Sequence, residues 1–564
     1  MQKKWVLKTA PEAEVQHLQE ALKIHPVLCR LLASRGIYTY DEARTFFRPE
    51  PTHLHDPFLM TDMLRAVERI EQAMQQGEKI LIFGDYDVDG TTSVALLYSF
   101  FRTIYPNHID YYVPNRYTEG YGISNQGIDF AAEKNFRLII ALDCGIKSVD
   151  KIDYANQRGI DFIICDHHTP GDIIPAARAV LDPKRKDCAY PFKELSGCGV
   201  GFKLLQAYGQ RNGFGWEALK EYLDLVVVSI GSDIVPIVGE NRTLAFFGLK
   251  KINENPSQGI KALKEIAGVK RPMSIADIVF MLGPRINAAG RMDDARHAVR
   301  LLLSESNELA TSHAGILNQK NIERKEADLS TTEEALSMLE SVPGFEHKRS
   351  TVLYKPGWHK GVIGIVASRL MDTYYRPTII LTESNGHVAG SARSVQGFNI
   401  YEAIKQCEDL LEQYGGHFFA AGLTMQASRV PAFIQRFEEV VAATITEKSL
   451  VPEIILDAEL EPADITPSFF RIMNQFAPFG PENMKPVFLT RQMQDTGWSR
   501  IVGEHHLKLS MHKGHSPTLS GIAFGMHQHL ETIAHKKHFD VCYTLEENEW
   551  QGDRKIELNV KDIR

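Results

Sequence analysis

Aspartates and histidines gather in four short clusters that span about 150 residues of this 564-residue chain. The clusters are GDYDVDG, ALDCG, CDHH and GSDIVP, and their acidic and imidazole side chains are Asp85, Asp87, Asp89, Asp143, Asp166, His167, His168 and Asp233. Carboxylates and imidazoles are the ligands that divalent ions such as Mn²⁺ and Mg²⁺ accept in proteins. So many of them in one stretch predict a site for two metal ions, and such sites mostly cleave phosphate esters.

Each of the first three clusters directly follows a short apolar run. Such runs predict buried strands, and they occur in KILIFGDYD, HIDYYVP, RLIIALDCG, DFIICDHH and ARAVLDP, most of them separated by helical stretches. Near-continuous apolar strands that alternate with helices are typical of a parallel sheet with helices on both faces. Because ligands bind beyond the carboxyl ends of the strands in such sheets, we expect the clusters to share one site.

The four clusters differ in how specific they are. The three aspartates of GDYDVDG alternate, so on an extended strand end they would share one face, although an Asp- and Gly-rich turn fits the same letters. In CDHH, Asp166 could orient one imidazole, whereas two surface histidines are the plainer alternative. Asp143 and Asp233 alone are typical of caps or turns. Together with the other clusters, metal ligation is the better interpretation of both.

The composition is that of an ordinary globular protein, with 44% apolar and 24% charged residues. The net charge of −8 does not exclude nucleic acid, because bound cations would offset the carboxylates of a metal site. The seven cysteines contain no CxxC pair, which argues against a disulfide framework or a structural zinc site. No segment offers about 18 uncharged apolar residues in a row, so we expect a cytoplasmic protein that does not enter a membrane.

The pattern of apolar runs predicts an α/β protein of several domains. The run from Glu305 to Glu340 holds one glycine and no proline, which indicates one long helix or two in tandem. The last segment has short β-like runs, consistent with a small barrel. The predicted parts are a helical lead-in (1–70), a parallel-sheet catalytic domain (71–300), a connecting helix (301–345), a smaller α/β domain (346–447) and an OB-like nucleic-acid-binding barrel (448–564).

The four clusters resemble, in order and spacing, the signature motifs of the DHH phosphoesterase superfamily. Other stretches resemble the bacterial RecJ family of single-stranded-DNA exonucleases within it, namely YPFKELSGCGVGFKL (190–204), IVPIVGENR (234–242), GPRINAAGRM (283–292), GWHKGVIGIVASRL (357–370), GSARS (390–394) and GGHFFAAG (415–422). The resemblance covers about residues 79–425 specifically and the two ends more loosely. It implies that the smaller α/β domain is a DHH-associated domain.

The resemblance also implies the composition of the metal site. Two ions, Mn²⁺ or Mg²⁺, would be held by Asp87, Asp89, Asp143, His168 and Asp233, with Asp85 and His167 beside them. Many members carry a histidine four residues before the position of Asp87, where this chain has Phe83, and Asp85 is then available as a ligand. The implied catalytic residues are Asp87, Asp89, Asp143, His167, His168 and Asp233. A metal-activated water would be the nucleophile, and we find no GxSxG or reactive-cysteine pattern that would supply another.

A second group of residues is predicted to bind phosphate. A planar guanidinium grips a phosphate through two hydrogen bonds, and Arg285 and Arg291 lie among small residues that allow a backbone to approach closely. The RecJ resemblance implies that Arg116, Ser391 and Arg393 form a pocket for a 5′-terminal phosphate. Structural ion pairs are the alternative for each arginine. The predicted DNA- and phosphate-binding residues are Arg116, Arg285, Asn287, Arg291, Ser391, Arg393 and His417.

The function that these motifs predict is 5′→3′ exonucleolytic degradation of single-stranded DNA to 5′-mononucleotides, in recombination and DNA repair. Two alternatives stay open: a DHH phosphodiesterase for short oligonucleotides or cyclic dinucleotides, and a non-catalytic single-strand-binding protein. The first typically lacks the lead-in and the barrel, and the second would have lost ligands that this chain keeps. We expect a monomer that binds single-stranded DNA with a 5′-phosphate. The resemblance alone implies a single-stranded-DNA-binding protein and a helicase as partners.

Overall fold

The computed structural model describes residues 3–535, 538–550 and 553–564. The chain folds into two compact units. The larger unit comprises Trp5–Pro114, Glu119–Gly283 and Ile455–Arg564, and the smaller unit is built mainly from Asn115–Thr118 and Pro284–Ile454. Each unit contains β-sheet and its own hydrophobic core.

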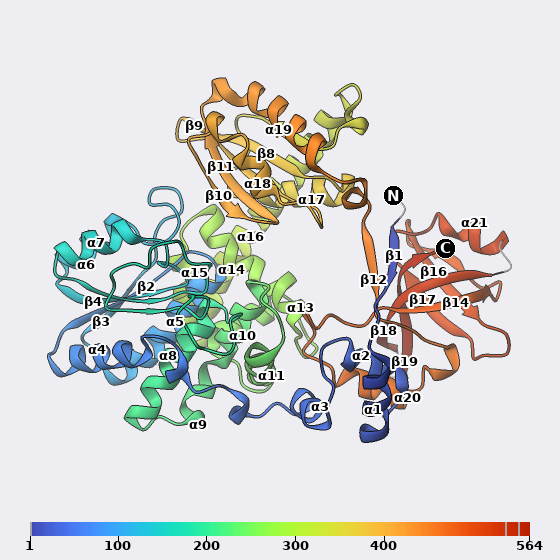
Figure 1. Cartoon of the computed structure of the whole chain (residues 1–564), viewed down its shortest axis with the longest axis horizontal. Coiled ribbons are helices and arrows are strands. Elements are labelled where there is room, and N and C mark those ends of the chain that lie inside the picture. The colour runs from blue at the N-terminus through green and yellow to red at the C-terminus, as the bar shows by residue number, and fades with distance from the viewer. Residues whose placement is uncertain (1–2, 536–537, 551–552) are drawn as a thin grey trace. The chain divides into compact units, whose positions relative to one another are not determined.

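A five-stranded parallel sheet carries the acidic clusters in the larger unit (Figure 1). Its strand order is β3-β2-β4-β5-β6, and every neighbouring pair is parallel. The strands are buried aliphatic runs, as expected when helices cover both faces. The five predicted strands are confirmed as β2 (Lys79–Gly84), β3 (Ile109–Tyr112), β4 (Phe136–Leu142), β5 (Asp161–Cys165) and β6 (Ala179–Leu181).

Four of these strands end level at one edge of the sheet. Gly84 of β2 pairs with Leu142 of β4, Leu142 with Cys165 of β5, and Cys165 with Leu181 of β6. The first aspartate of each of the first three clusters, Asp85, Asp143 and Asp166, is the next residue after β2, β4 and β5. The register of the sheet therefore brings these clusters side by side.

Helices α6 and α7 cover one face of this sheet, and α4, α5 and α8 cover the other (Figure 1). The apolar run before Asp233 is a helix, α10, which packs against α5, α8 and α11 and is buried along most of its length. The helices of this region are α4 (Met63–Gln75), α5 (Val88–Ile104), α6 (Asn125–Glu133), α7 (Val149–Gln157), α8 (Gly197–Asn212), α9 (Trp216–Leu219), α10 (Leu223–Ser232), α11 (Gly239–Glu254), α12 (Gln258–Ile266) and α13 (Ile275–Asp277).

The smaller unit has a mixed sheet with the strand order β10-β11-β9-β8-β7. Only β7 and β8 pair in parallel, and they confirm the two predicted strands STVLYKPG and RPTIILT. The glycine-rich motifs GSARS and GGHFFAAG, whose letters predict no strand, lie mostly in the antiparallel strands β9, β10 and β11. The strands are β7 (Thr351–Tyr354), β8 (Thr378–Ser384), β9 (His387–Arg393), β10 (Gln413–His417) and β11 (Ala420–Met425).

A single long helix, α16 (Asn307–Glu340), confirms the predicted connecting helix and shows that it is not two helices in tandem. Its N-terminus is capped by Ser306, whose hydroxyl accepts a hydrogen bond from the Leu309 N–H. The other helices here are α14 (Gly283–Met292), α15 (Arg296–Leu302), α17 (Ile363–Tyr374), α18 (Ile400–Lys405) and α19 (Val430–Thr444). Two predicted domain borders, at 70 and 300, lie within the residue ranges of α4 and α15.

The C-terminal region of the larger unit forms a closed ring of strands. Strand β14 pairs with β18, β18 with β19, β19 with β17, β17 with β16, and β16 again with β14. Closure pairs each of these strands on both sides, as in a small barrel. The elements are β12 (Glu453–Leu456), β13 (Ala458–Glu459), α20 (Pro467–Asn474), β14 (Phe488–Asp495), β15 (Arg500–Val502), β16 (His506–His512), β17 (Leu519–Ala523), α21 (His529–His535), β18 (Phe539–Trp550) and β19 (Asp553–Ile563).

The N-terminal helices share their hydrophobic core with this ring. Leu18, Leu31 and Phe46 are buried in one cluster with Phe488 and Val541. The two ends of the chain therefore fold as one body, which the sequence did not predict. The N-terminal elements are β1 (Lys4–Leu7), α1 (Glu12–Leu22), α2 (Pro26–Ala33) and α3 (Tyr40–Phe47).

Arg242 of α11 joins this body to the parallel-sheet region. Its buried guanidinium donates hydrogen bonds to the carbonyls of Phe46 (2.9 Å), Phe476 (2.8 Å) and Ala477 (2.9 Å). It also lies 3.7 Å from the centre of the Phe46 ring, a cation–π contact. One side chain from the sequence GENR thus binds segments from both ends of the chain.

Candidate metal centre and phosphate-binding residues

Asp143 lies at the sheet edge directly after β4. Its N–H donates to the Cys165 carbonyl at 2.9 Å, and its φ of 58° places it in the left-handed region. A non-glycine residue there costs about 1–3 kcal/mol, and such conformations cluster at functional sites. Gly197 permits the close approach of α8, because a Cβ at that position would lie 2.7 Å from the Asp143 Cβ.

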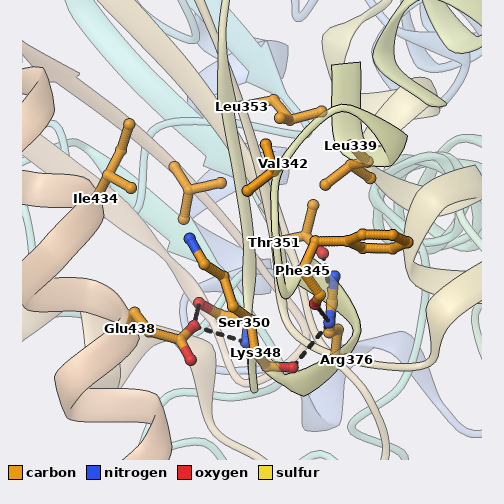
Figure 2. Close-up of a pocket in the computed structure, with 11 residues that line it drawn as sticks. Leu339, Val342, Phe345, Lys348, Ser350, Thr351, Leu353, Arg376, Ile434 and Glu438 are labelled. Atoms are coloured by element: carbon orange, nitrogen blue, oxygen red, sulfur yellow. Dashed lines mark hydrogen bonds between the residues drawn. The ribbon is translucent and has the colours of Figure 1, made fainter. Parts of the chain in front are cut away.

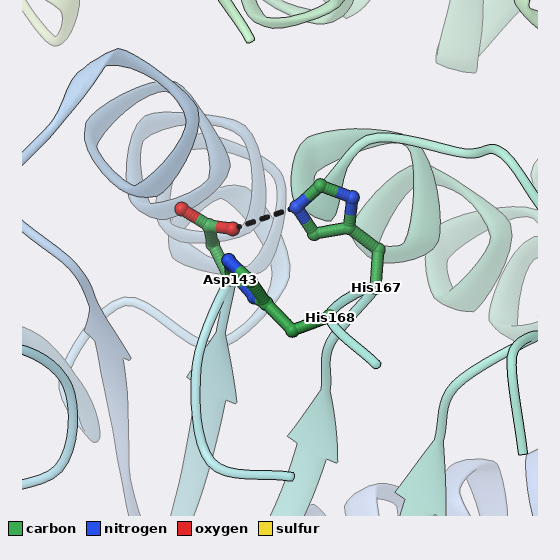
Figure 3. Close-up of side chains that lie close together, drawn as sticks. All are labelled: Asp143, His167 and His168. Atoms are coloured by element: carbon green, nitrogen blue, oxygen red, sulfur yellow. Dashed lines mark ion pairs between the residues drawn. The ribbon is translucent and has the colours of Figure 1, made fainter. Parts of the chain in front are cut away.

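His167 stands among three carboxylates. Its Nε2 atom lies 3.2 Å from Oδ1 of Asp143, 3.5 Å from Oδ2 of Asp233 and 3.7 Å from Oδ2 of Asp89. Figure 3 shows the contact with Asp143 and the neighbouring ring of His168. Neither ring nitrogen of His167 makes a hydrogen bond within the described part of the chain, although the side chain is buried. An imidazole placed in this way is available to a cation that the carboxylates would share.

His168 is held from outside this group by Asp166. Nδ1 of His168 lies 2.7 Å from Oδ1 of Asp166, and Nε2 lies 3.2 Å from the Tyr121 hydroxyl. Burial by itself would raise the pKa of Asp166, but hydrogen bonds from His168 and from the Ile146 N–H lower it to about 2. Asp166 therefore orients one imidazole, as expected, and the oriented ring is that of His168.

The GDYDVDG motif does not form an extended strand end, so the prediction that its three aspartates share one strand face is wrong. Asp87 is the N-cap of α5 and accepts a hydrogen bond from the Gly90 N–H at 3.0 Å, and Asp89 lies in the first turn of that helix. Asp85 is buried, and its Oδ1 accepts a hydrogen bond from the Gly122 N–H at 3.2 Å. Phe83 is a core residue of β2.

The carboxylate of Asp89 is fixed by the start of α8. It accepts hydrogen bonds from the N–H groups of Gly197 (2.7 Å) and Cys198 (2.8 Å) and from the Ser229 hydroxyl (2.7 Å). Amide donors at a helix N-terminus stabilise an anion. The SGCGVG stretch, part of the resemblance to the RecJ family, therefore positions one of the site's carboxylates.

The electrostatics of this edge favour a bound cation. Burial and the charges of Asp89 and Asp87 raise the pKa values of Asp143 and Asp233 well above the usual range of a carboxyl group. Two sets of possible ligand atoms lie within 4.8 Å of one another: Asp143, His167 and His168, and Asp89, His167 and Asp233. Oxygen and imidazole nitrogen donors with excess negative charge fit a divalent ion such as Mn²⁺ or Mg²⁺.

The predicted phosphate-binding residues belong to the smaller unit. Arg285, Asn287 and Arg291 lie on α14, where Nε of Arg285 donates to Asn318 Oδ1 at 3.0 Å and Nη1 of Arg291 donates to the Gly361 carbonyl at 3.1 Å. All three are half-buried. The structure therefore spreads them along one helix and ties the second arginine to the loop before α17.

Ser391, Arg393 and His417 lie on one face of the smaller sheet. Nη1 of Arg393 donates to the Ser391 hydroxyl at 3.2 Å. Arg393 pairs with Ala420, which pairs with His417, so His417 stands two strands, or roughly 10 Å, from Arg393. The structure thus brings Ser391 and Arg393 together, whereas His417 is exposed and lies apart from them on the same sheet face.

Two residues that the sequence analysis did not select lie near Arg116. Burial and then the charge of Arg116 lower the pKa values of both His359 and Lys360. The only signal in the sequence was their position in GWHKGVIG, since a single histidine or lysine has no pattern of its own. The tertiary structure also packs the His359 ring against that of Tyr117, the residue after Arg116.

A small cavity of about 40 Å³ lies at the end of α16, between β7 and α19 (Figure 2). Buried Arg376 lines it and donates hydrogen bonds of 2.7 Å to Thr351 Oγ1 and to the carbonyls of Phe345 and Lys348. The residues lining this cavity include no predicted site residue. Its volume suits a few water molecules, so we regard it as a packing defect.

Family models match three parts of the chain. The model of the DHH family, N-terminal domain, matches residues 79–230, that of the DHHA1 domain matches 348–443, and that of the RecJ OB domain matches 456–562. A parallel sheet with carboxylates and two adjacent histidines at its carboxyl edge, matched by the first of these models, defines the class as proteins with a DHH domain.

Curated relatives match over nearly the whole chain. The single-stranded-DNA-specific exonuclease RecJ of Bacillus subtilis is 37% identical, covering 99% of this chain and 70% of that protein, and the RecJ of Escherichia coli is 34% identical, covering 96% of each. A crystal structure of RecJ from Thermus thermophilus in complex with Mn²⁺ covers 100% of this chain and 79% of that one, with a TM-score of 0.85 and 29% identity. The chain belongs to the RecJ family, and the resemblance read from its motifs is confirmed.

Within the part of the chain that the structure covers, no helix combines the length and the apolar character needed to cross a bilayer.

Proposed function

We propose that this chain is a metal-dependent exonuclease that degrades single-stranded DNA from its 5′ end to 5′-mononucleotides, in recombination and DNA repair. The observation that carries the proposal is the placement of His167 Nε2 among the carboxylates of Asp89, Asp143 and Asp233, at 3.2 to 3.7 Å. Membership of the RecJ family supports it, because the curated relatives are named single-stranded-DNA-specific exonucleases.

We assign two divalent ions, Mn²⁺ or Mg²⁺, to the carboxyl edge of the parallel sheet. The proposed ligands are Asp85, Asp87, Asp89, Asp143, His167, His168 and Asp233. His167 joins the set predicted from sequence because its ring, and not that of His168, stands among the three carboxylates. When bound, the ions would lower the pKa of a water molecule and neutralise charge on the phosphate in the transition state.

The residues of the chain hold this arrangement rigid. Asp89 cannot reorient without losing its hydrogen bonds to Gly197, Cys198 and Ser229. Asp166 fixes the ring of His168 through a 2.7 Å contact. Groups that are already oriented before substrate binds add no reorganisation cost to the reaction.

Phosphate binding is proposed for the smaller unit. Arg393 with Ser391 would bind the terminal 5′-phosphate, because a guanidinium beside a hydroxyl offers several donors to one phosphate group. Arg116, Arg285, Asn287, Arg291 and His417 would contact the DNA backbone. These contacts carry no sequence information and suit a nuclease that accepts any single strand.

The test is digestion of a 5′-labelled and a 3′-labelled single-stranded oligonucleotide, with Mn²⁺ and with EDTA, beside a duplex control. The proposal expects immediate release of the 5′ label as mononucleotide, gradual shortening of the 3′-labelled strand, and no reaction in EDTA. If long strands survive and dinucleotides or cyclic dinucleotides are cleaved, the proposed metal site stands, but the proposed substrate, long single-stranded DNA, is refuted. Rapid release of the 3′ label would reverse the polarity.

We also propose that the chain acts as a monomer in the cytoplasm, together with a single-stranded-DNA-binding protein and a helicase. Family membership supports these assignments. Light scattering of the purified full chain measures its molecular mass, and the mass of a dimer would refute the monomeric state.

A further inference from the structure

The loop before α17 contains two side chains that the proposed function does not use, His359 and Lys360. Both are half-buried. They lie close to Arg116, whose positive charge lowers the pKa of each after the larger effect of burial. All three belong to the smaller unit.

His359 is fixed with one nitrogen facing its own loop. Its Nδ1 accepts a hydrogen bond from the Gly361 N–H at 3.1 Å, so in the neutral ring the hydrogen is carried by Nε2. The ring of Tyr117 packs edge-on against it, with 6.3 Å between the ring centres. His359 is therefore an oriented hydrogen-bond donor, and both burial and Arg116 favour its neutral form.

The loop itself is clamped against α14. Nη1 of Arg291 donates to the Gly361 carbonyl at 3.1 Å, and the Tyr117 hydroxyl donates to the Arg291 carbonyl. A Cβ at Gly361 would lie 2.4 Å from that same carbonyl oxygen, so only glycine fits here. These contacts hold Arg116, Tyr117 and His359 in fixed relation to one another.

The first turn of α17 connects this group to Arg393. A Cβ at Gly364 would lie 2.9 Å from the Ser391 hydroxyl and 3.0 Å from Nη2 of Arg393. His359 and Lys360 lie five and four residues before Gly364 in the chain. Lys360 makes no ion pair with a carboxylate of the described residues, so its charge is available to an anion.

We infer that His359 and Lys360 bind a backbone phosphate of the single strand, separate from the terminal phosphate bound by Arg393 and Ser391. His359 donates a neutral hydrogen bond through Nε2, and Lys360 contributes a positive charge. The inference rests on the proposed function for its substrate class, a single-stranded polynucleotide.

The test compares the variants Lys360→Met and Arg393→Ala with the wild-type chain. Binding of 5′-phosphorylated and 5′-hydroxyl single strands is measured by fluorescence anisotropy in EDTA over a range of KCl concentrations. Loss of one phosphate contact should reduce the slope of log K against log salt by about 0.7. We expect Lys360→Met to show this smaller slope and an equal, several-fold loss of affinity for both strands. Arg393→Ala should lower the affinity for the 5′-phosphorylated strand alone. Lys405→Met, an exposed lysine of α18, is the matched control.

His359 is tested by two substitutions of different length. The Asn side-chain oxygen can accept the hydrogen bond from the Gly361 N–H in place of Nδ1, but Asn has no donor at the position of Nε2. His359→Asn should therefore keep the wild-type melting temperature and bind both strands with lower affinity. His359→Gln places an amide near Nε2 and should restore part of the affinity if the variant folds.

An unchanged salt slope and affinity in Lys360→Met would overturn the inference, and so would a loss confined to the 5′-phosphorylated strand. Equal affinity of His359→Asn and the wild type for both strands would show that His359 does not bind the backbone phosphate. These binding results are independent of hydrolysis. A chain that binds as expected but releases no mononucleotide with Mn²⁺ would refute the proposed function and leave this inference standing.

Discussion

At the scale of single residues, the site concentrates negative charge that the protein alone does not neutralise. Asp143 is the clearest case, because it is buried, strained at φ 58°, and close to His167 and several carboxylates. An acid whose pKa is raised in the folded state destabilises the fold once the pH exceeds its unfolded pKa, and the penalty disappears at low pH. A divalent cation at the site would relieve it.

Replacing Asp143 with Asn should separate the role of its charge in catalysis from its effect on stability. We expect loss of hydrolysis by roughly 1,000-fold or more, since an ion held by this carboxylate would stabilise transition-state charge much as an oxyanion-hole donor does. Without metal, the variant should melt at a higher temperature than the wild type at pH 8 and at the same temperature only below about pH 4, the usual pKa of an unfolded aspartate. Thermal melts with and without Mn²⁺ measure this. A variant that retains turnover, or that Mn²⁺ stabilises as much as the wild type, would contradict the assignment.

At the scale of elements, the first turn of α17 positions the phosphate-binding groups through the absence of a side chain. Gly364 is surrounded by Ser391 and Arg393 at distances that leave no room for a Cβ. Gly315 of α16, in contrast, has no neighbouring atom within 4 Å of such a Cβ. The two glycines therefore form a matched pair of helical positions.

Gly364→Ala should displace Arg393 and reduce the preference for 5′-phosphorylated over 5′-hydroxyl strands about tenfold, a loss of about 1.4 kcal/mol. Gly315→Ala should leave that preference unchanged and stabilise α16 by up to about 1 kcal/mol. Steady-state kinetics on both substrates and urea unfolding measure these effects. An unchanged preference in Gly364→Ala would show that Arg393 does not bind the terminal phosphate.

At the scale of the whole molecule, Arg242 and the shared N- and C-terminal core determine what can be removed. Deleting the residues from about 450 onward would expose the apolar faces of α1, α2 and α3, because these helices pack in the same core as the ring of strands. Such a deletion would therefore test folding and not DNA binding. Point substitutions are the cleaner experiment.

Arg242→Leu should leave the carbonyls of Phe46, Phe476 and Ala477 buried without donors and cost roughly 2–3 kcal/mol of unfolding free energy. Urea unfolding followed by fluorescence measures the loss. Arg429→Leu, in the smaller unit, is the control because Arg429 is exposed. Equal stability of the two variants would show that Arg242 does not hold the region together.

Trp498→Ala should weaken binding of long single strands about tenfold and leave turnover on short ones nearly unchanged. Trp498 is 76% exposed in the OB domain, near the strand that carries exposed Ile501, and stacking of a base on an aromatic ring contributes about 1–3 kcal/mol. Tyr40→Ala, an exposed aromatic residue of α3, is the control. Equal affinity of the two variants for long strands would place the nucleic acid elsewhere on the domain.

The sequence by itself determined the parallel sheet and the position of Asp85, Asp143 and Asp166 at its edge. Apolar strands separated by helices mostly run parallel, and the carboxyl ends of parallel strands meet at one edge. Only the tertiary structure decided that Asp89 lies in a helix, that His167 and not His168 stands among the carboxylates, and that both chain ends share one core. These outcomes depend on contacts between segments far apart in the chain, such as α8 with Asp89, and local sequence patterns contain no information about such contacts.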